Sequence, residues 1–334
     1  MKTLSVIAVV LVVLILLLST QRVESWVISE KPFDIVYTWV DSTDPDFMRE
    51  KEKYASHENK IGEANQAMRY EMLEELRYSL RSLDQHCPNF RKVFIVVADG
   101  QKPDFVDFDH PSIELVTHSQ IIPAQYLPTF NSLCIESFLH LIPGLLDRYV
   151  YFNDDLILNS DVRFFNHRGE PIITHEERKD PIEDIDMNNP PEYTFDNMLA
   201  WNYAYIREKY GLSIYDMSSH APSACLKPAE DKMIDLTDKR LQKTAASKFR
   251  QTDNMAFTSV IRPIFYKHVM KFPSDSFNTV ILSAGPGFLR DLNKEVNSPD
   301  TKVIVINSMD PYDVREYHEI MKQRFPIPSR FEKN

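Results

Sequence analysis

Short apolar runs alternate with helix-like patterns through the first half of the chain. The runs are rich in β-branched and aromatic residues, which is typical of buried strands. They cover residues 33–40, 92–98, 113–116 and 149–152. Between them, apolar side chains recur at helical spacing over residues 66–86 and 131–141. Strands that alternate with helices predict an α/β fold, Rossmann-like, with a mostly parallel central sheet flanked by helices.

The second half of the chain predicts more helix and loop than strand. Residues 176–191 are polar and bounded by proline, which indicates a loop or the boundary of an insertion. The remaining expected elements are helices at 195–210, at 245–270 with a break near Pro263, and at 312–325, and strands at 279–282 and 302–306. We expect residues 26–334 to form a single domain, with residues 160–245 as an insertion or lid.

The first 25 residues have the pattern of a targeting segment. Lys2 precedes an apolar run at 4–18, and Val23 and Ser25 fit the small-residue pattern of a cleavage site. The run is long for a signal peptide and short for a membrane span, so a cleaved signal peptide and an uncleaved signal anchor both stay open. Either directs the protein to the secretory pathway, in the Golgi lumen or membrane, or outside the cell if the leader is cleaved. An anchor would attach the protein to a membrane.

Charge and glycine content narrow the ways in which this chain can bind an anion. The net charge is -11, and no Lys/Arg-rich run is present, so we expect no nucleic-acid partner. The chain has only 7 glycines, and they form neither a dinucleotide-binding nor a Walker motif. A backbone cradle for phosphates of either kind is therefore excluded, and an anionic ligand would need local arginines or metal ions.

Acidic side chains follow three of the expected strands. Asp41 and Asp99 come after the first two, and Asp154 and Asp155 interrupt the apolar stretch YVYFNDDLIL. Ligands bind at the carboxyl ends of parallel strands, so these acids are expected to converge. Paired carboxylates can hold a divalent cation against a diphosphate, but Asn and Asp are also common in plain turns. For Asp154 and Asp155, a plain turn and a cation site are about equally favoured. For Asp41, a plain turn is favoured over a cation site.

Four basic or titratable side chains are candidates for phosphate and proton chemistry. Arg77 and Arg81 are four residues apart on one helix face, where they could grip phosphate oxygens or pair with glutamates of the same helix. His220 stands in the loop-like SSHAPSA and could act as an acid or base, although a lone histidine is more often an ordinary loop residue. Arg250 stands in SKFRQTDN. No local spacing links His220 or Arg250 to the acids.

Four separated blocks carry a resemblance to a known family. They are DIVYTWVDSTDP; EELRYSLRSLDQHCPNFRKVFIVVADGQKPDF with LPTFNSLCIESFLHLIPGLLDRYVYFNDDLIL; SSHAPSACL with ASKFRQTDNMAF; and VIVINS with FPIPSRFEK. In this order they resemble the Stealth family of sugar-1-phosphate transferases, which includes bacterial capsule polymerases and the lysosomal-enzyme GlcNAc-1-phosphotransferase. The resemblance covers residues 33–333.

The resemblance implies an activity. The family transfers a hexose-1-phosphate, here expected to be GlcNAc-1-phosphate, from a UDP-sugar to a hydroxyl of a glycan or glycoprotein, and releases UMP. The chain is too short for the recognition modules that large animal members carry between these blocks. We therefore expect a glycan or glycoconjugate acceptor rather than one selected protein.

The resemblance also implies roles for individual residues. Trp39, Val40 and Asp41 are expected to face the nucleotide, and Arg77 and Arg81 to support the diphosphate or the loops around it. The expected reaction centre consists of Asn153, Asp154, Asp155, His220 and Arg250. In it, Asp154 and Asp155 would bind Mg²⁺ or Mn²⁺ or take the acceptor proton. His220 would be the acid or base, and Arg250 would neutralise phosphoryl charge.

Two other functions stay open. A metal-dependent glycosyltransferase would also use a nucleotide sugar, but it would break the sugar–oxygen bond and release UDP. A lumenal carbohydrate-binding protein with an inactive site would bind sugar without turnover. The released nucleotide distinguishes the first alternative from phosphotransfer.

Overall fold

The computed structural model describes residues 31–55, 74–177, 185–275 and 277–333. The expected leader at 1–25 and the first part of the helix expected at 66–86 lie outside this range. The chain divides into two units. One consists of Pro32–Asn166 with Glu170–Asn334 and holds the elements below. The other consists of Met1–Lys31 with His167–Gly169, of which only Lys31 and residues 167–169 are described.

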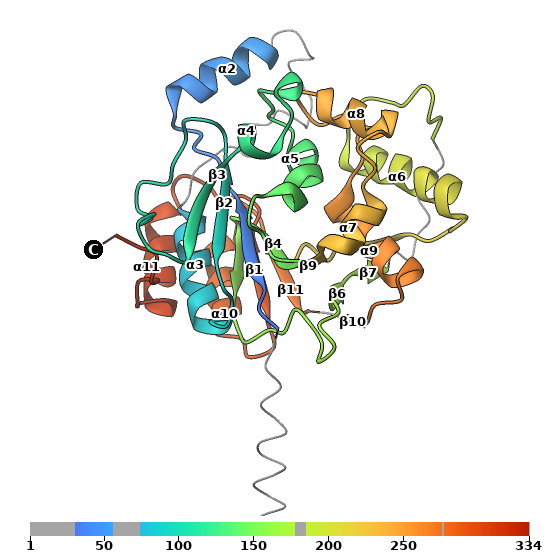
Figure 1. Cartoon of the computed structure of the whole chain (residues 1–334). Helices are drawn as coiled ribbons and strands as arrows, with labels where there is room; N and C mark the ends of the chain where they lie inside the picture. Colours follow the sequence, from blue (N-terminus) through green and yellow to red (C-terminus); the bar gives the residue numbers. More distant parts are fainter. Residues whose placement is uncertain (1–30, 56–73, 178–184, 276, 334) are drawn as a thin grey trace, which may run out of the picture. The chain divides into compact units, whose positions relative to one another are not determined.

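A five-stranded sheet forms the centre of the larger unit (Figure 1). In sheet order its strands are β3 (Ile113–Thr117), β2 (Val93–Val97), β1 (Asp34–Thr38), β4 (Arg148–Asn153) and β9 (Ser223–Leu226). The first four are parallel, and β9 runs antiparallel to β4. The chain builds outward from β1 to β3 and then returns to the other side of β1 as β4. This arrangement confirms the predicted α/β class with a mostly parallel central sheet.

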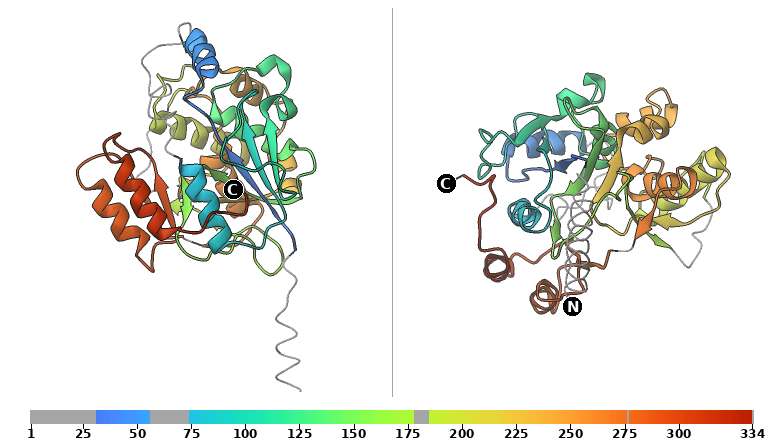
Figure 2. Two further views of the ribbon diagram at one scale, coloured as in Figure 1. Left: turned by 90° about the vertical axis from the view of Figure 1, so that its left-hand side faces the viewer. Right: turned by 60° about the horizontal axis from the view of Figure 1, so that its bottom comes forward.

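A second sheet continues directly from the first. It consists of β11 (Thr279–Leu282), β12 (Val303–Ile306) and β5 (Leu156–Leu158), with β5 antiparallel to β12. The helices α10 (Phe288–Val296) and α11 (Val314–Arg324) pack on it through a cluster that includes Leu292, Ile304 and Tyr317. Figure 2 shows these two helices beside α3 (Glu75–His86). One apolar cluster joins α3 to strands of both sheets, so this helix fastens the two sheets together.

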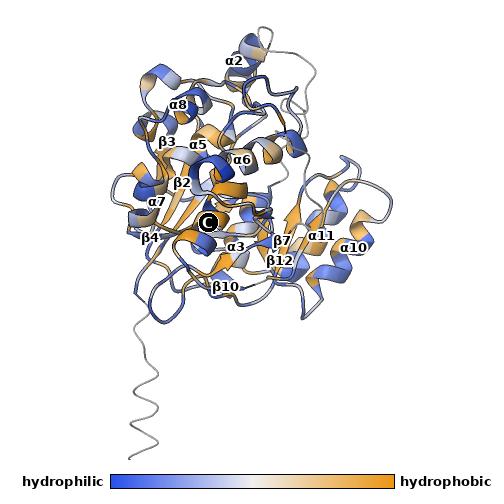
Figure 3. Ribbon diagram, turned by 90° about the vertical axis from the view of Figure 1, so that its right-hand side faces the viewer, coloured by the Kyte–Doolittle hydropathy of each residue, from blue (hydrophilic) through white to orange (hydrophobic). Residues whose placement is uncertain are grey.

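Alternating side chains give the central sheet two buried faces, as a parallel sheet requires. On β4, Val150 and Phe152 belong to the cluster that contains α3, whereas Tyr149 and Tyr151 belong to the cluster on the opposite face. That opposite face is covered by α5 (Ser132–Phe138). Figure 3 shows the resulting concentration of hydrophobic residues along the strands.

Further short elements surround the sheets. The helices are α2 (Pro45–Ala55), α4 (His118–Ile121), α6 (Phe195–Tyr210), α7 (Lys227–Met233), α8 (Lys239–Ala246) and α9 (Arg262–Ile264), with 3₁₀ turns at Ala124–Tyr126 and Leu139–Leu141 and π-helical turns at Phe257–Ile261 and Phe265–Val269. The remaining strands are β6 (Ile173–Thr174), β7 (Glu176–Glu177), β8 (Asp216–Met217) and β10 (Ser274–Asp275). In the region expected to be an insertion or lid, β9 completes the central sheet, and the lid role stays a prediction.

The prediction of a helix at 245–270 is wrong for residues 247–256. These residues form a loop between α8 and the first π-helical turn. The buried Asn254 holds this loop in place. Its Oδ1 accepts hydrogen bonds from Asn131 Nδ2 at 2.8 Å and from Gln251 N at 3.0 Å, and its carbonyl accepts one from Asn202 Nδ2 at 2.9 Å. These bonds replace the helical ones, which is why an apolar pattern at helical spacing misled the prediction.

Within the described ranges, no helix is both long enough and apolar enough to cross a membrane. The three cysteines are free and buried.

A fully buried ion pair organises the helical part of the unit. Arg262 donates from Nε and Nη2 to the two carboxylate oxygens of Glu230 at 2.9 and 3.0 Å. Tyr266 Oη donates to Glu230 Oε1 at 2.7 Å. The Arg262 guanidinium, the strongest partner of this carboxylate, holds the pKa of Glu230 below its usual value despite burial. The pair joins α7 to α9, and breaking it would leave an uncompensated charge in the core.

We expect Glu230→Ala to lower the free energy of unfolding by about 3–5 kcal/mol, because it strands the buried guanidinium of Arg262. The matched control is Glu208→Ala, which removes an ion pair with Arg240 whose side chains are 36% and 56% exposed. That change is expected to cost less than about 1 kcal/mol. Urea unfolding at neutral pH measures both. Equal losses in the two variants would contradict the role given to the buried pair.

Candidate active site

A cavity of about 280 Å³ opens where the carboxyl ends of β1 and β4 lie side by side. Strand order reverses between these two strands, and such a switch point is where open α/β sheets bind ligands. The sequence-predicted residues that line the cavity are Trp39, Val40, Asn153, Asp154, Asp155, His220 and Arg250. Side chains far apart in the sequence therefore meet in one place.

The two acids occupy the turn from one sheet to the other. Asn153 ends β4 in register with Thr38 of β1, and β5 begins at Leu156. The carbonyl of Asp155 accepts a hydrogen bond from Ile306 N at 3.1 Å, which ties the turn to the second sheet. The backbone of Asp154 and Asp155 is thus held from both sides.

Burial makes these carboxylates unusual. The Asp155 side chain is 22% exposed, but its Oδ1 is buried and has no hydrogen-bond partner in the described part of the chain. Desolvation raises the pKa of both carboxyls, and the charge of Asp155 raises the pKa of Asp154 further. Such a pair is poised either to keep a proton at neutral pH or to receive a positive group.

His220 reaches the acids from the segment between β8 and β9. Its Nε2 lies 3.9 Å from Asp155 Oδ2. Its backbone has φ of 51°, a left-handed conformation that is costly for a residue with a side chain and that often occurs at functional sites. Burial lowers the pKa of His220, and the nearby charge of Arg250 lowers it further. The imidazole is therefore neutral at pH 7 and has a nitrogen lone pair to accept a proton.

Arg250 comes from the loop that follows α8. Its Nε and Nη2 both donate to Ser132 Oγ, at 3.1 and 2.6 Å. Ser132 is the first residue of α5, and the N-cap residue Asn131 bonds to Asn254 of the Arg250 loop. The buried amide pair therefore positions both partners of the Arg250–Ser132 contact.

Sequence reasoning missed Glu136, which lies one turn after Ser132 on α5 and lines the same cavity. It is buried, and its Oε2 has no hydrogen-bond partner among the described residues. Its charge acts to raise the pKa of His220, opposing the larger effects of burial and Arg250. A glutamate on the buried face of a short helix is the one signal that could have identified it, since buried acids are rare.

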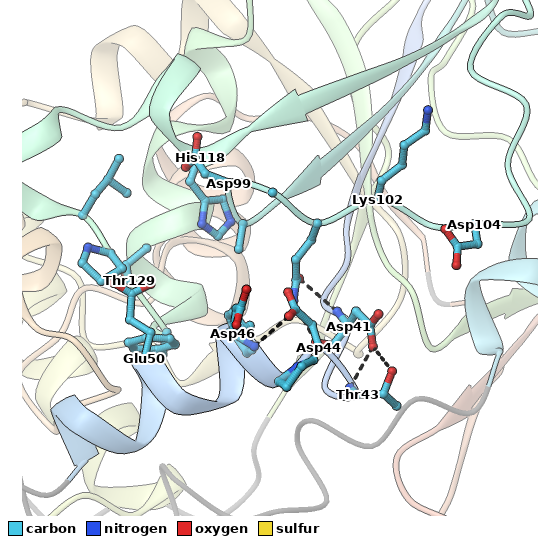
Figure 4. A pocket seen from close by; sticks show the side chains of 18 residues that line it. Asp41, Thr43, Asp44, Asp46, Glu50, Asp99, Lys102, Asp104, His118 and Thr129 are labelled. Atoms are coloured by element: carbon cyan, nitrogen blue, oxygen red, sulfur yellow. Dashed lines mark hydrogen bonds between the residues drawn. The ribbon is translucent and has the colours of Figure 1, made fainter.

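Asp41 lies in a neighbouring, larger cavity of about 850 Å³ rather than beside Asp154 (Figure 4). Its Oδ1 accepts hydrogen bonds from the backbone N and Oγ1 of Thr43 at 2.7 and 2.6 Å. A third cavity of about 160 Å³ connects the two. It shares Trp39, Val40, Asn153, Asp154 and Arg250 with the first cavity and Phe47, Ala98, His118, Thr129 and Phe130 with the large one.

Arg77 and Arg81 do not line these three cavities. Arg81 donates from Nε and Nη2 to the Glu332 carboxylate at 2.7 and 2.8 Å, and Arg77 Nη1 donates to Glu332 Oε2 at 3.0 Å. Arg77 also pairs with Glu74. These contacts fasten the C-terminal segment to α3, while direct support of a diphosphate stays a prediction.

The acids fit a divalent cation. No group of three or more His, Cys, Asp or Glu with metal-binding geometry occurs among residues 31–55, 74–177, 185–275 and 277–333. Mg²⁺, however, needs only one or two carboxylates when substrate phosphates and water supply the other ligands. A bound cation would give a partner to Asp155 Oδ1, which has none among the described residues. It would also stabilise the ionised form of both carboxyls, whose pKa values are raised without it.

Two family models match separate stretches of the chain. The model of Stealth protein CR1, conserved region 1, matches residues 31–58, and that of Stealth protein CR2, conserved region 2, matches residues 69–172. These regions hold β1 and its Asp41 loop, and β2 to β5 with Asp154 and Asp155.

Curated relatives extend the match over most of the chain. Two exopolysaccharide phosphotransferases of Streptomyces coelicolor are 33% and 32% identical over 319 and 314 residues, covering 90% of this chain and 52% of each relative. The chain thus spans about half the length of these curated relatives. Capsular polysaccharide phosphotransferase WcwK of Streptococcus pneumoniae is 28% identical over 321 residues, covering 87% of this chain and 94% of WcwK.

Similarity to solved structures is weaker. The glycosyltransferase GlyE of Streptococcus pneumoniae aligns over 90% of this chain and 65% of its own, with 10% identity and a TM-score of 0.38. The conserved-region matches and the curated relatives confirm the resemblance drawn from the four sequence blocks: the chain belongs to the Stealth protein family.

Proposed function

We propose that this protein transfers a sugar-1-phosphate from a nucleotide sugar to a hydroxyl of a glycan. The observation that carries the proposal is the meeting of His220 with Asp155, at 3.9 Å, in a cavity that Asp154 and Arg250 also line. The names of the relatives, which are phosphotransferases of exopolysaccharide and capsular polysaccharide, support the same reaction.

His220 is the general base of the proposed reaction. As the acceptor oxygen forms its bond to phosphorus, the hydroxyl proton moves to the imidazole. A neutral imidazole is needed at this moment, and the lowered pKa of His220 supports that state. The carboxylate of Asp155, close to Nε2, then stabilises the imidazolium that forms.

Arg250 acts on the phosphoryl group. Negative charge grows on the phosphoryl oxygens as the new bond to the acceptor forms and the phosphoanhydride bond breaks. A guanidinium already oriented by Ser132 can stabilise that charge without reorganising. The bond electrons leave with the nucleoside monophosphate. The sugar–oxygen bond is untouched, so the anomeric configuration is kept.

Asp154 and Asp155 would hold Mg²⁺ or Mn²⁺, which supplies positive charge to the diphosphate when bound. We further propose a UDP-sugar as the donor, with GlcNAc-1-phosphate as the transferred group, and a glycan or glycoprotein as the acceptor. The leader pattern at 1–25 supports a place in the secretory pathway, with the Golgi as the proposed compartment.

The released nucleotide tests the reaction class. Incubation with a panel of UDP-sugars and simple glycosides is expected to release UMP in step with a new phosphodiester, because the anhydride bond is the one that breaks. Chromatography of the nucleotide and ³¹P NMR of the sugar product give the two readouts. Release of UDP would contradict phosphotransfer and establish glycosyl transfer.

Removal of the guanidinium tests its proposed role. We expect Arg250→Ala to lower kcat about a hundredfold or more, because the lost charge acts mainly in the transition state. Ser132→Ala, which removes one hydrogen-bond partner of Arg250 and keeps the guanidinium, is expected to lower kcat by a smaller factor. Arg240→Ala, outside the cavity lining, is the matched control and should keep the parental kcat. Equal kcat in Arg250→Ala and Arg240→Ala would refute the assignment.

Cation binding should depend on pH in a defined direction. The two carboxyls have raised pKa values, so they hold protons at mildly acidic pH, and a cation must displace these. Mg²⁺ affinity, measured by calorimetry, is therefore expected to rise between about pH 6 and about pH 8 as the carboxyls ionise. Asp154→Asn should lower the Mg²⁺ affinity at both pH values. Asp161→Asn, outside the cavity lining, should leave it unchanged. A pH-independent affinity would show that these carboxyls are not the ligands.

A further inference from the structure

The 850 Å³ cavity beside the reaction centre repels anions. It lies between α2 and the loops that follow β1 and β2, as Figure 4 shows. Its charged lining residues are Asp41, Asp44, Asp46, Glu50, Asp99, Asp104 and Lys102. Such an excess of carboxylates disfavours a phosphate group, so the diphosphate of the donor belongs with Arg250 and not here.

His118 is a buried polar group that points into this cavity without a partner. It follows β3 at the start of α4 and is only 6% exposed. It lines both the large cavity and the connecting one, and Figure 4 shows no hydrogen bond to its ring. Among the described residues, no partner for either ring nitrogen is found. The ring nitrogens are not among the buried atoms that lack a partner, so they reach the cavity and can exchange hydrogen bonds with a ligand there.

The chemistry of His118 indicates a neutral ligand. Burial lowers its pKa to about 4, so the ring is uncharged at neutral pH, with one nitrogen as donor and the other as acceptor. A hydroxyl group also donates and accepts, and it complements such a ring. Phosphate or carboxylate would instead face the six carboxylates that line the same cavity, which outnumber its one lysine.

The rest of the wall is held in place before any ligand arrives. Gln101 is 4% exposed, and its Nε2 donates to Asp41 O at 2.7 Å and to Asp44 Oδ2 at 3.3 Å. The carboxylate of Asp99 accepts hydrogen bonds from the backbone N and Oγ of Ser119. Fixed carboxylate oxygens with remaining lone pairs accept hydrogen bonds from hydroxyls. Phe130, also in the lining, offers a flat apolar surface to a ring.

We propose that this cavity binds a neutral ring that bears hydroxyl groups, with His118 as its recognition residue. The inference rests on the proposed function for the identity of the ring, which is either the ribose of the donor nucleoside or a sugar unit of the acceptor. The connecting cavity, lined by His118 at one end and by Asp154 and Arg250 at the other, joins this ring to the reaction centre.

Binding of uridine and of a methyl glycoside panel, each measured separately by calorimetry, tests the proposal and distinguishes the two sources. His118→Leu keeps a similar side-chain volume and removes both ring nitrogens. It is expected to lower the affinity for whichever probe binds by about fivefold to twentyfold. His118→Gln, which keeps a donor and an acceptor, should restore much of the affinity. The affinity should not change with salt, because the ligand is neutral.

His110→Leu is the matched control, since His110 does not line these cavities and its Nδ1 accepts from Ser112 N. Thermal unfolding checks that each variant is folded. Should His118→Leu fail to fold, Ala98→Phe, which fills the junction of the large and connecting cavities, must abolish binding instead. Unchanged affinity in a folded His118→Leu, or binding of neither probe to the parent, overturns the proposal.

These outcomes are independent of the nucleotide-product experiment. UMP release with unchanged affinity in His118→Leu overturns the cavity proposal alone. His118-dependent binding of a glycoside with no UMP release overturns the proposed function alone.

Discussion

The structure depends on a two-residue turn that carries two partly buried carboxylates. Asp154 and Asp155 join β4 of the central sheet to β5 of the second sheet, and neighbouring strands hold each end of the turn. Taking carboxylates out of water is costly unless a positive group or hydrogen bonds compensate. Here the compensation is incomplete, because Asp155 Oδ1 has no partner among the described residues. The two carboxylates are therefore held in place by paired strands on either side of the turn.

The other functional groups are brought to this point by polar contacts in the core. His220 precedes β9, which adds to the edge of the central sheet beside β4, and this pairing sets its approach to Asp155. The Asn131–Asn254 contact joins the start of α5 to the loop of Arg250. Apolar packing builds the two sheets and their covering helices. Buried amides and one left-handed residue place the groups that can do chemistry.

The parts of this arrangement that could be predicted are those with a local signal. The strands β1, β2 and β4 are largely buried apolar runs and β3 is a short, partly buried one, so their existence and a mostly parallel sheet followed from pattern. The expected convergence of the acids is met in part, because Asp154 and Asp155 line one cavity and Asp41 and Asp99 line the neighbouring one. Ile157 belongs to the same apolar stretch YVYFNDDLIL as β4, but it lies in β5, which pairs with β12 of a different sheet. An apolar run does not reveal which strand it will pair with.

The parts that could not be predicted depend on partners far along the chain. Arg77 and Arg81 share a helix face as expected, but the residue they bind, Glu332, is 255 and 251 positions away. Asn254, which interrupts an expected helix, acts through Asn131, 123 positions away. The resemblance of four blocks to one family supplied what spacing could not, namely that His220 and Arg250 belong with the acids.

The most direct test is a crystal structure of the His220→Ala variant with a UDP-sugar and Mg²⁺. We expect the diphosphate to lie in the cavity between β1 and β4, with its oxygens bonded to Arg250 and the cation bound to Asp154 and Asp155. A donor whose diphosphate lies outside that cavity, away from Arg250, would contradict this expectation.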